Sequence, residues 1–170
     1  MNSSTDVRGL IEVLGDHNEG KSIGSVRPTC TKHTAVSCEY FTVYAVLNNL
    51  SNHDWRSSSG DDIYLSYHWH SSNGKVIVFD GERTSLRVPV ARGETKRLPL
   101  TVKAPSISGP CLLEVTLIKE GKYWLDDMGL VRWLVSAQID PPALPMLSSR
   151  AFRIHRNLKD AIEKNKMERN

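Results

Sequence analysis

Residues 15 to 22 read GDHNEGKS and match the G-x-x-x-x-G-K-[ST] pattern of a phosphate-binding P-loop. In a P-loop the glycine-rich turn leads into a helix, whose N-terminal backbone amides bind the phosphates. After Ser22, however, Gly24 and Pro28 lie among β-branched residues, which oppose a helix. We therefore interpret this segment as a polar turn and not as a nucleotide-binding site.

Two histidines, His68 and His70, lie two residues apart on one expected strand. This spacing can bring two imidazoles to one metal ion, with His53 and Asp54 as further ligands. Polar residues on the outer face of a sheet have the same pattern, and no third ligand follows at a compelling spacing. We therefore predict no metal site.

Catalytic groups are not indicated by the remaining polar residues. The sequence has no G-x-S-x-G nucleophile motif, and its paired acids, at positions 61–62 and 126–127, are direct neighbours. Side chains of neighbouring residues in a loop point apart, so these pairs do not resemble the two facing carboxylates of a glycosidase. We predict a protein that is not an enzyme and has neither catalytic residues nor a cofactor.

Another set of residues has the composition of a sugar-binding site, in which aromatic rings stack on pyranose C–H groups and planar polar side chains bind the hydroxyls. Two tryptophans fall in or beside expected loops, and four charged residues, Glu82 among them, lie at strand ends where loops present binding groups. From these we predict a glycan-binding site formed by Trp55, Asp80, Arg83, Glu120 and Trp124.

The role of Arg83 within this set has two interpretations. Arg83 can form an ion pair with Glu120 that closes one end of the fold, or it can bind the sugar. If the glycan is acidic, the Arg83 guanidinium is the natural partner for its carboxylate.

Strands must position these residues. From about residue 36 to residue 139, short runs of alternating apolar and polar residues are separated by turn residues at intervals of about 8 to 12 positions. About seven such runs predict an all-β, immunoglobulin-like antiparallel β-sandwich. In the run at 63–70, Trp69 alternates in step with Leu65, so we expect Trp69 in the core.

The chain divides into three parts. Residues 1–35 form an N-terminal extension, in which the apolar run at 10–14 can be an edge strand, and residues 36–140 form the β-sandwich domain. Residues 141–170 begin with a proline-rich linker and continue with apolar residues at helical spacing among basic ones. This basic C-terminal helix is expected to pack on the sandwich or on a protein partner, or to contact a membrane surface.

Charge is concentrated in that tail. Residues 150–170 carry seven basic and three acidic residues, a net charge of +4 within a total of +3. The body therefore lacks the positive field of a nucleic-acid-binding protein, and we predict no nucleic-acid partner.

The location of the protein is indicated by what its sequence lacks. No apolar run approaches the roughly 18 residues of a membrane span, and the N-terminus does not resemble a secretory signal. Three cysteines without C-x-x-C spacing suggest reduced thiols. We expect a cytoplasmic protein.

Five motifs follow one another between residues 65 and 124. They are L-x-Y-x-W at 65–69, D-G-x-R-T-x-L at 80–86, G-E at 93–94, A-P at 104–105 and E-G-x-x-W at 120–124. This stretch resembles a small bacterial β-sandwich module appended to glycosyltransferases and methyltransferases of surface-polysaccharide loci. It is also similar to the carbohydrate-binding C-terminal domain of O-antigen ABC transporter ATPases.

The resemblance implies a freestanding or excised accessory domain that recognises a glycan during assembly or export of a bacterial cell-surface polysaccharide. An alternative is a structural or protein-interaction domain that docks onto a glycosyltransferase, a methyltransferase or an ABC transporter, with the C-terminal helix making the contact. An immunoglobulin-like fold serves many functions, so the residues of the site have to decide between the two.

Overall fold

The computed structural model describes residues 10–13, 22–58 and 62–143. Over these residues the chain forms eleven strands and one short 3-10 helix, η1 (Leu125–Met128), so the expected all-β class is confirmed. The strands are β1 (Leu10–Val13), β2 (Gly24–Pro28), β3 (Lys32–Val36), β4 (Tyr40–Asn49), β5 (Ile63–Ser71), β6 (Val76–Val78), β7 (Thr84–Ser85), β8 (Thr95–Lys103), β9 (Gly109–Lys119), β10 (Tyr123–Trp124) and β11 (Leu130–Asp140).

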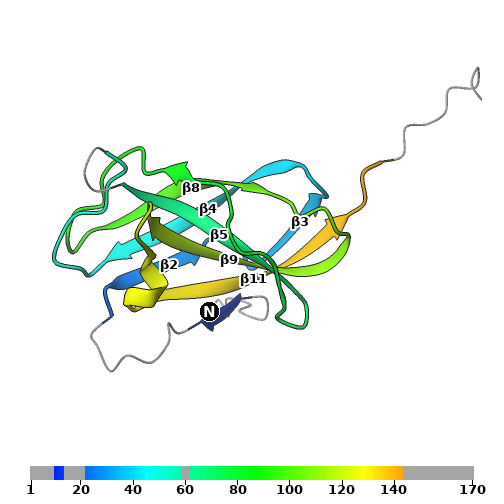
Figure 1. Ribbon diagram of the computed structural model, residues 1–170, viewed down its shortest axis with the longest axis horizontal. Coiled ribbons are helices and arrows are strands. Elements are labelled where there is room, and N and C mark those ends of the chain that lie inside the picture. Colours follow the sequence, from blue (N-terminus) through cyan, green and yellow to red (C-terminus); the bar gives the residue numbers. More distant parts are fainter. Residues whose placement is uncertain (1–9, 14–21, 59–61, 144–170) are drawn as a thin grey trace, which may run out of the picture.

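Hydrogen bonds join the strands into one curled sheet, in which seven strands follow the order β6-β5-β9-β11-β2-β4-β8 (Figure 1). β2 and β3 run parallel to β11, whereas the longest ladders, β4 with β8 and β5 with β9, are antiparallel. Most strands coincide with the runs of alternating apolar and polar residues that predicted them, because each run has one apolar side that must be buried.

The core forms from alternate residues of these strands. Val43, Ala45 and Leu47 of β4 are buried, as are Leu113 and Val115 of β9, while the residues between them in β4 are at least partly exposed. Trp69 of β5 is completely buried in the same cluster. The expectation of a core position for Trp69 is therefore confirmed.

Side chains close the curl where the backbone ladder ends. Trp69 Nε1 donates to the carbonyl of Lys103 at 2.9 Å, and the Lys103 amide donates to the hydroxyl of Tyr67 at 3.0 Å. The Thr101 amide donates to Thr84 Oγ1 at 3.1 Å. Side chains of β5 and β7 thus bond the backbone of β8, the strand at the far end of the sheet order.

The N-terminal part contributes more to the sheet than an edge strand. β2 lies between β11 and β4, and β3 pairs with β11, although both strands begin within residues 1–35. Pro28 and Cys30 interrupt the apolar pattern there, so the sequence shows no regular run. β1 pairs with β11, as an edge strand at 10–14 requires.

The rejection of a P-loop agrees with the structure. Residues 15–21 lie outside the described residues, but Ser22 is followed by the strand β2 and not by a helix. The expected C-terminal helix also lies outside the described residues. The three cysteines, Cys30, Cys38 and Cys111, are free.

Candidate functional site

Four of the five residues predicted to bind a glycan lie together. Asp80, Arg83, Glu120 and Trp124 line one open cleft of about 320 Å³ on the outer side of β5 and β9. The remaining lining residues are Phe79, Ile118, Gly121, Lys122 and Tyr123. We call this the Trp124 cleft.

One wall of the cleft is the segment from Phe79 to Arg83, which is fixed against β5. The Gly81 amide donates to the Tyr67 carbonyl at 3.1 Å, and Ser66 Oγ donates to the Gly81 carbonyl at 3.0 Å. A Cβ atom at Gly81 would lie 2.3 Å from the Tyr67 carbonyl oxygen, so only glycine fits this close approach. The side chains of this wall are therefore held in place by main-chain packing.

The other wall is the turn between β9 and β10. Gly121 has φ of 67°, a conformation that suits glycine, and the Lys122 amide donates to the Lys119 carbonyl at 3.0 Å. This turn presents Glu120 on one side, while β10 pairs with β9 and places Trp124 over the sheet.

Arg83 joins the two walls. Its Nε donates to Glu120 Oε2 at 2.7 Å, and its Nη1 donates to Asp80 Oδ1 at 2.5 Å. Burial alone would lower the pKa of Arg83, but the hydrogen bonds with Glu120 and Asp80 outweigh it and raise the pKa. The expected Arg83–Glu120 ion pair is confirmed, and the guanidinium stays charged.

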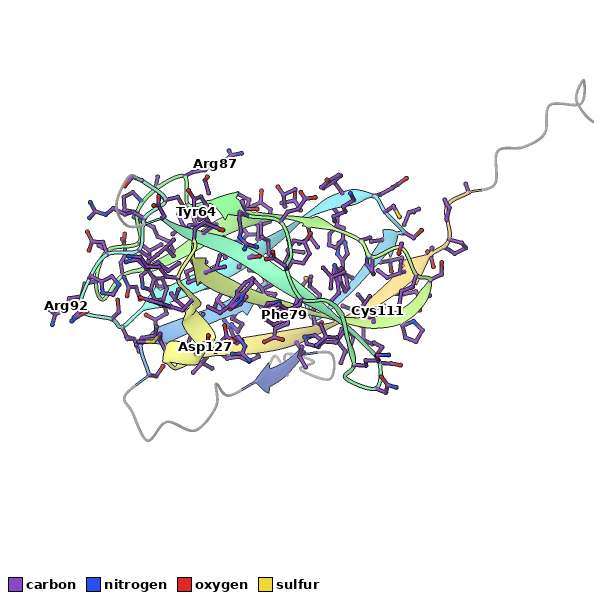
Figure 2. The ribbon with its side chains drawn as sticks, viewed as in Figure 1. Tyr64, Phe79, Arg87, Arg92, Cys111 and Asp127 are labelled. Atoms are coloured by element: carbon purple, nitrogen blue, oxygen red, sulfur yellow. The ribbon has the colours of Figure 1, made fainter. Side chains whose placement is uncertain are left out.

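Three aromatic rings lie beside these charges. The Trp124 ring is 4.4 Å from the His68 ring and 5.6 Å from the Phe79 ring, and the Arg83 guanidinium lies 5.1 Å over it. The Phe79 ring stacks on His68 at 4.8 Å, yet 57 % of Phe79 is exposed. Arg83 therefore covers part of Trp124, whereas more than half of Phe79 is exposed; Figure 2 labels Phe79 among the side chains of the domain.

Phe79 was missed by the sequence analysis. It ends the apolar run at 76–79, and such a run predicts a core strand, so its last residue was not considered for binding. The useful signal is its position directly before the Asp80-Gly81 turn, because a large apolar residue at a turn is often exposed to a ligand.

A buried ionic network supports the cleft from below. Glu114 on β9 hydrogen-bonds His70 Nε2 at 2.7 Å and also accepts a bond from Arg132 Nε. Arg132 Nη1 is 2.9 Å from Asp126 Oδ2, and Thr116 Oγ1 donates to Asp126 at 3.3 Å. The network links β5, β9, β11 and η1, and it lies beside His68, whose ring contacts Trp124.

Burial and pairing shift the protonation equilibria of this network in different directions. Burial would raise the pKa of Glu114, but the hydrogen bond from His70 and the charge of Arg132 lower it overall. Burial raises the pKa of Asp126 despite the nearby Arg132 charge. Burial also lowers the pKa of His68, whose Nδ1 donates to the Phe79 carbonyl.

The two histidines considered for a metal are both engaged by protein groups. The His68 and His70 ring centroids are 6.4 Å apart, and the His53 ring bonds Asn52. Within residues 10–13, 22–58 and 62–143, no group of three or more His, Cys, Asp or Glu side chains could hold a metal ion.

Trp55, the fifth predicted residue, lies elsewhere. It is 0 % exposed, pairs with Val90 through a backbone bridge and packs its ring against Gly24. The expectation of an exposed, loop-borne ring is therefore wrong for Trp55, because the chain after β4 folds back into the core. Its Nε1 finds no hydrogen-bond acceptor among the described residues.

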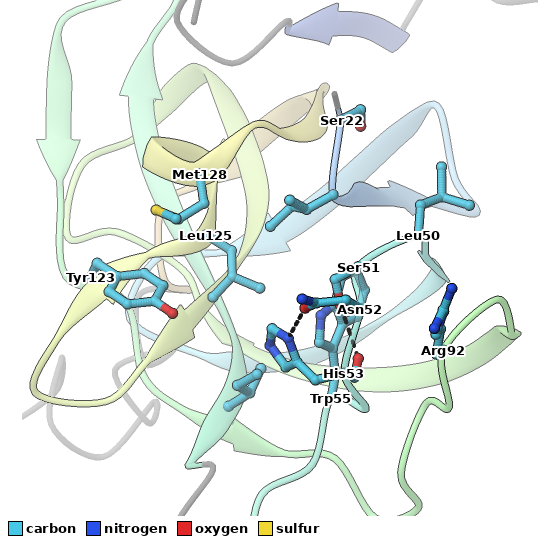
Figure 3. A pocket seen from close by; sticks show the side chains of 12 residues that line it. Ser22, Leu50, Ser51, Asn52, His53, Trp55, Arg92, Tyr123, Leu125 and Met128 are labelled. Carbon is cyan, nitrogen blue, oxygen red and sulfur yellow. Dashed lines mark hydrogen bonds between the residues drawn. The ribbon is translucent and has the colours of Figure 1, made fainter. Parts of the chain in front are cut away.

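Trp55 lines a different cavity, of about 380 Å³, between the loop after β4 and η1 (Figure 3). Buried Ile63 and Leu125 line it with Trp55, and Leu50 and Met128 are exposed at it. Asp80, Arg83, Glu120 and Trp124 do not line this cavity. The structure thus separates Trp55 from the other four predicted residues.

Glu82, in the same loop as Asp80, points to yet another place. It accepts a hydrogen bond from the Tyr40 hydroxyl at 2.7 Å, on the side of β4. It does not line the Trp124 cleft.

Comparison with known proteins gives only distant similarities. No protein-family model matches the sequence, and a comparison with curated proteins gives no match either. Among solved structures, the chain is similar to the C-terminal domain of Wzt, with 9 % sequence identity and a TM-score of 0.48 over 77 % of this chain and 78 % of that one.

Two further similarities are to parts of larger enzymes. A family 123 glycoside hydrolase from Clostridium perfringens is 10 % identical with a TM-score of 0.39, over 69 % of this chain and 24 % of that one. The alkylpurine DNA glycosylase AlkC of Pseudomonas fluorescens, bound to DNA containing an abasic site analog, is 8 % identical with a TM-score of 0.37, over 69 % and 31 %. These low values carry no argument about function.

No helix in the part of the chain that the structure describes is long and apolar enough to cross a membrane.

Proposed function

We propose that the protein is a non-catalytic carbohydrate-binding module and that the Trp124 cleft holds the glycan. The observation that carries this proposal is the open Phe79 ring beside Asp80, Arg83 and Glu120, all fixed in one cleft. An exposed ring stacks on the C–H face of a pyranose, and rigid charged side chains beside it bind the hydroxyls.

Preorganisation supports this function. The Phe79–Arg83 wall is held by bonds from Gly81 and Ser66, and Arg83 is held by Asp80 and Glu120, so little side-chain freedom is lost when a sugar binds. Phe79 and Trp124 provide the apolar contacts, while Asp80, Arg83 and Glu120 provide the polar ones. Trp55 has no place in this site.

The wider role follows from the motifs at 65–124. We take the fold to be an immunoglobulin-like β-sandwich, since the curl of the sheet brings β5 against β8. The protein then acts in the cytoplasm as an accessory module in assembly or export of a bacterial cell-surface polysaccharide. The basic helix expected within residues 141–170 is its contact with a protein partner or with the membrane surface.

Titration of the full chain against an array of bacterial surface polysaccharides and their oligosaccharides tests the proposal. Phe79→Ala is expected to weaken binding about tenfold, the effect of losing one stacked ring. Tyr44→Ala is the matched control, because Tyr44 is an exposed ring outside the cleft. Absence of binding to every glycan, or turnover of simple glycosides by the isolated chain, would contradict the proposal.

A further inference from the structure

Arg83 is already neutralised within the Trp124 cleft. Besides its bonds to Glu120 and Asp80, its Nη1 donates to the Gly81 carbonyl at 2.5 Å and lies 3.4 Å from Ser66 Oγ. Two carboxylates and a carbonyl thus surround one guanidinium. Nε and Nη1 of Arg83 are thus occupied, so a ligand carboxylate could pair with these two nitrogens only by displacing Asp80, Glu120 or the Gly81 carbonyl; Nη2 alone makes no hydrogen bond within the described residues.

Asp80 and Glu120 supply the free acceptors of the cleft. Asp80 and Glu120 each use one oxygen for Arg83, and their side chains remain 70 % and 47 % exposed. The second oxygen of each makes no hydrogen bond within the described residues, so it is available to ligand hydroxyls. A ligand must bring donors to these two positions.

The remaining cation of the cleft is Lys122, an exposed residue of the turn after β9. It forms no ion pair with another described residue, and it is exposed at the surface, where its attraction is screened by salt. Asp80 and Glu120 are both bonded to Arg83, whose guanidinium lies over the Trp124 ring, and their charge repels an anion placed at that ring.

We propose that the Trp124 cleft selects neutral sugars and discriminates against acidic ones. This inference rests on the proposed function. It replaces the expectation that Arg83 serves as the partner for the carboxylate of an acidic glycan. In the bound state the pyranose stacks on Phe79, its hydroxyls donate to Asp80 and Glu120, and Arg83 keeps both carboxylates in position.

The test compares matched neutral and acidic oligosaccharides with the full chain. Galactose- and galacturonate-based, glucose- and glucuronate-based, and mannose- and mannuronate-based pairs are titrated by calorimetry at low salt. The neutral member of a bound pair is expected to bind about tenfold more tightly than the acidic one. Equal or tighter binding of the acidic member overturns the inference and leaves the proposed function intact.

A variant assigns the preference to the cleft. Glu120→Gln keeps an acceptor at the same position but removes a charge. The ratio of the affinities for the neutral and the acidic sugar is therefore expected to fall severalfold. Glu39→Gln is the control, because Glu39 is an exposed acid that does not line the cleft. An unchanged preference in Glu120→Gln overturns the inference.

The two proposals fail in different ways. Binding of an acidic sugar that is lost in Lys122→Gln also overturns the inference, since it would show that Lys122 and not the carboxylates selects the ligand. No binding of any member of the three pairs, or of any glycan on the array, contradicts the proposed function itself.

Discussion

Two outer faces of the same sheet carry similar side chains but differ in what lies over them. The covered face, on β5, β9 and β11, consists of Ser66, His68, His70, Glu114, Thr116 and Arg132. The open face, on β4 and β8, consists of Tyr40, Thr42, Tyr44, Arg97, Thr101 and Lys103. All six residues of the open face are exposed, whereas four of the covered face are buried.

The faces differ because other segments of the chain cover one of them and leave the other open to solvent. On the open face, cations lie over their neighbours' rings, Arg97 over Tyr44 at 4.2 Å and Lys103 over Tyr40 at 5.3 Å, and solvent reaches all of them. On the covered face, the segment 79–83 and η1 exclude solvent, so each charge must find a partner. A recognition cleft therefore arises here from a second layer of backbone and not from side-chain composition.

The largest expected difference between the faces comes from the same substitution made on each. Arg132→Met leaves Glu114 and Asp126 buried without their cation and is expected to lower the free energy of unfolding by about 3 kcal/mol. Arg97→Met removes an exposed cation and should cost less than about 0.5 kcal/mol. Urea denaturation measures both, and equal effects would show that burial does not distinguish the faces.

Gly81→Ala is expected to displace the segment 79–83, which covers the covered face. The new methyl group would overlap the Tyr67 carbonyl, so the segment must move away from β5, at about 2 kcal/mol and with loss of glycan binding. Gly93→Ala, next to β8, meets no atom within 4 Å and bears only the strain of its φ of 76°, about 1 kcal/mol. If Gly81→Ala still binds the glycan, the binding site does not depend on the position of this segment.

A smaller difference is expected for two exposed rings. Phe79→Ala loses the stack on His68 and should lower the free energy of unfolding by about 1 kcal/mol. Tyr44→Ala loses an exposed cation–π contact and should cost about 0.5 kcal/mol. Thermal and urea unfolding measure both effects. A larger loss of stability in Tyr44→Ala than in Phe79→Ala would contradict the expectation that the ring on the covered face contributes more.

The smallest expected effect is a dependence of stability on pH that the covered face introduces. Burial lowers the pKa of His68 below its reference value of 6.5, and burial does the same for His33 of β3, which lies outside the covered face. Below pH 6.5 these histidines bind protons more readily in the unfolded chain than in the folded one. The free energy of unfolding therefore falls as the pH falls. The contribution is fully present above pH 6.5.

Urea unfolding at pH 7 and pH 5.5 checks this slope, and His68→Gln should flatten it. Glu114 acts below this window, because its pKa is lowered from a reference value of 4.5, whereas the raised pKa of Asp126 acts against the slope from His68. Stability that stays constant or rises toward pH 5.5 would contradict the burial of a neutral His68.

Alternation in the sequence was sufficient to predict the long strands and the core position of Trp69, because each run has a buried side. β2 and β3 could not be found in this way, since Pro28 and Cys30 break their pattern and β11, with which both pair, lies about 100 residues away. The burial of Trp55 likewise depends on a bridge to Val90, a long-range contact outside any regular run.

The candidate site was predictable in part for a similar reason. Asp80, Arg83, Glu120 and Trp124 stand at turns, and turns at one end of a sheet meet in space. What Arg83 does there depends on Glu120, 37 positions away, and on how closely Gly81 approaches β5, and neither follows from local pattern. Phe79 was hidden because its strand ends one residue earlier than the apolar run.

The side-chain closure at β8 also limits self-association. Three successive outward positions of this strand offer no free amide: Pro99 has none, and those of Thr101 and Lys103 are taken by Thr84 and Tyr67. The Lys103 carbonyl is taken by Trp69. An incoming strand from another molecule finds no template along this stretch, which guards the protein against polymerisation through added strands.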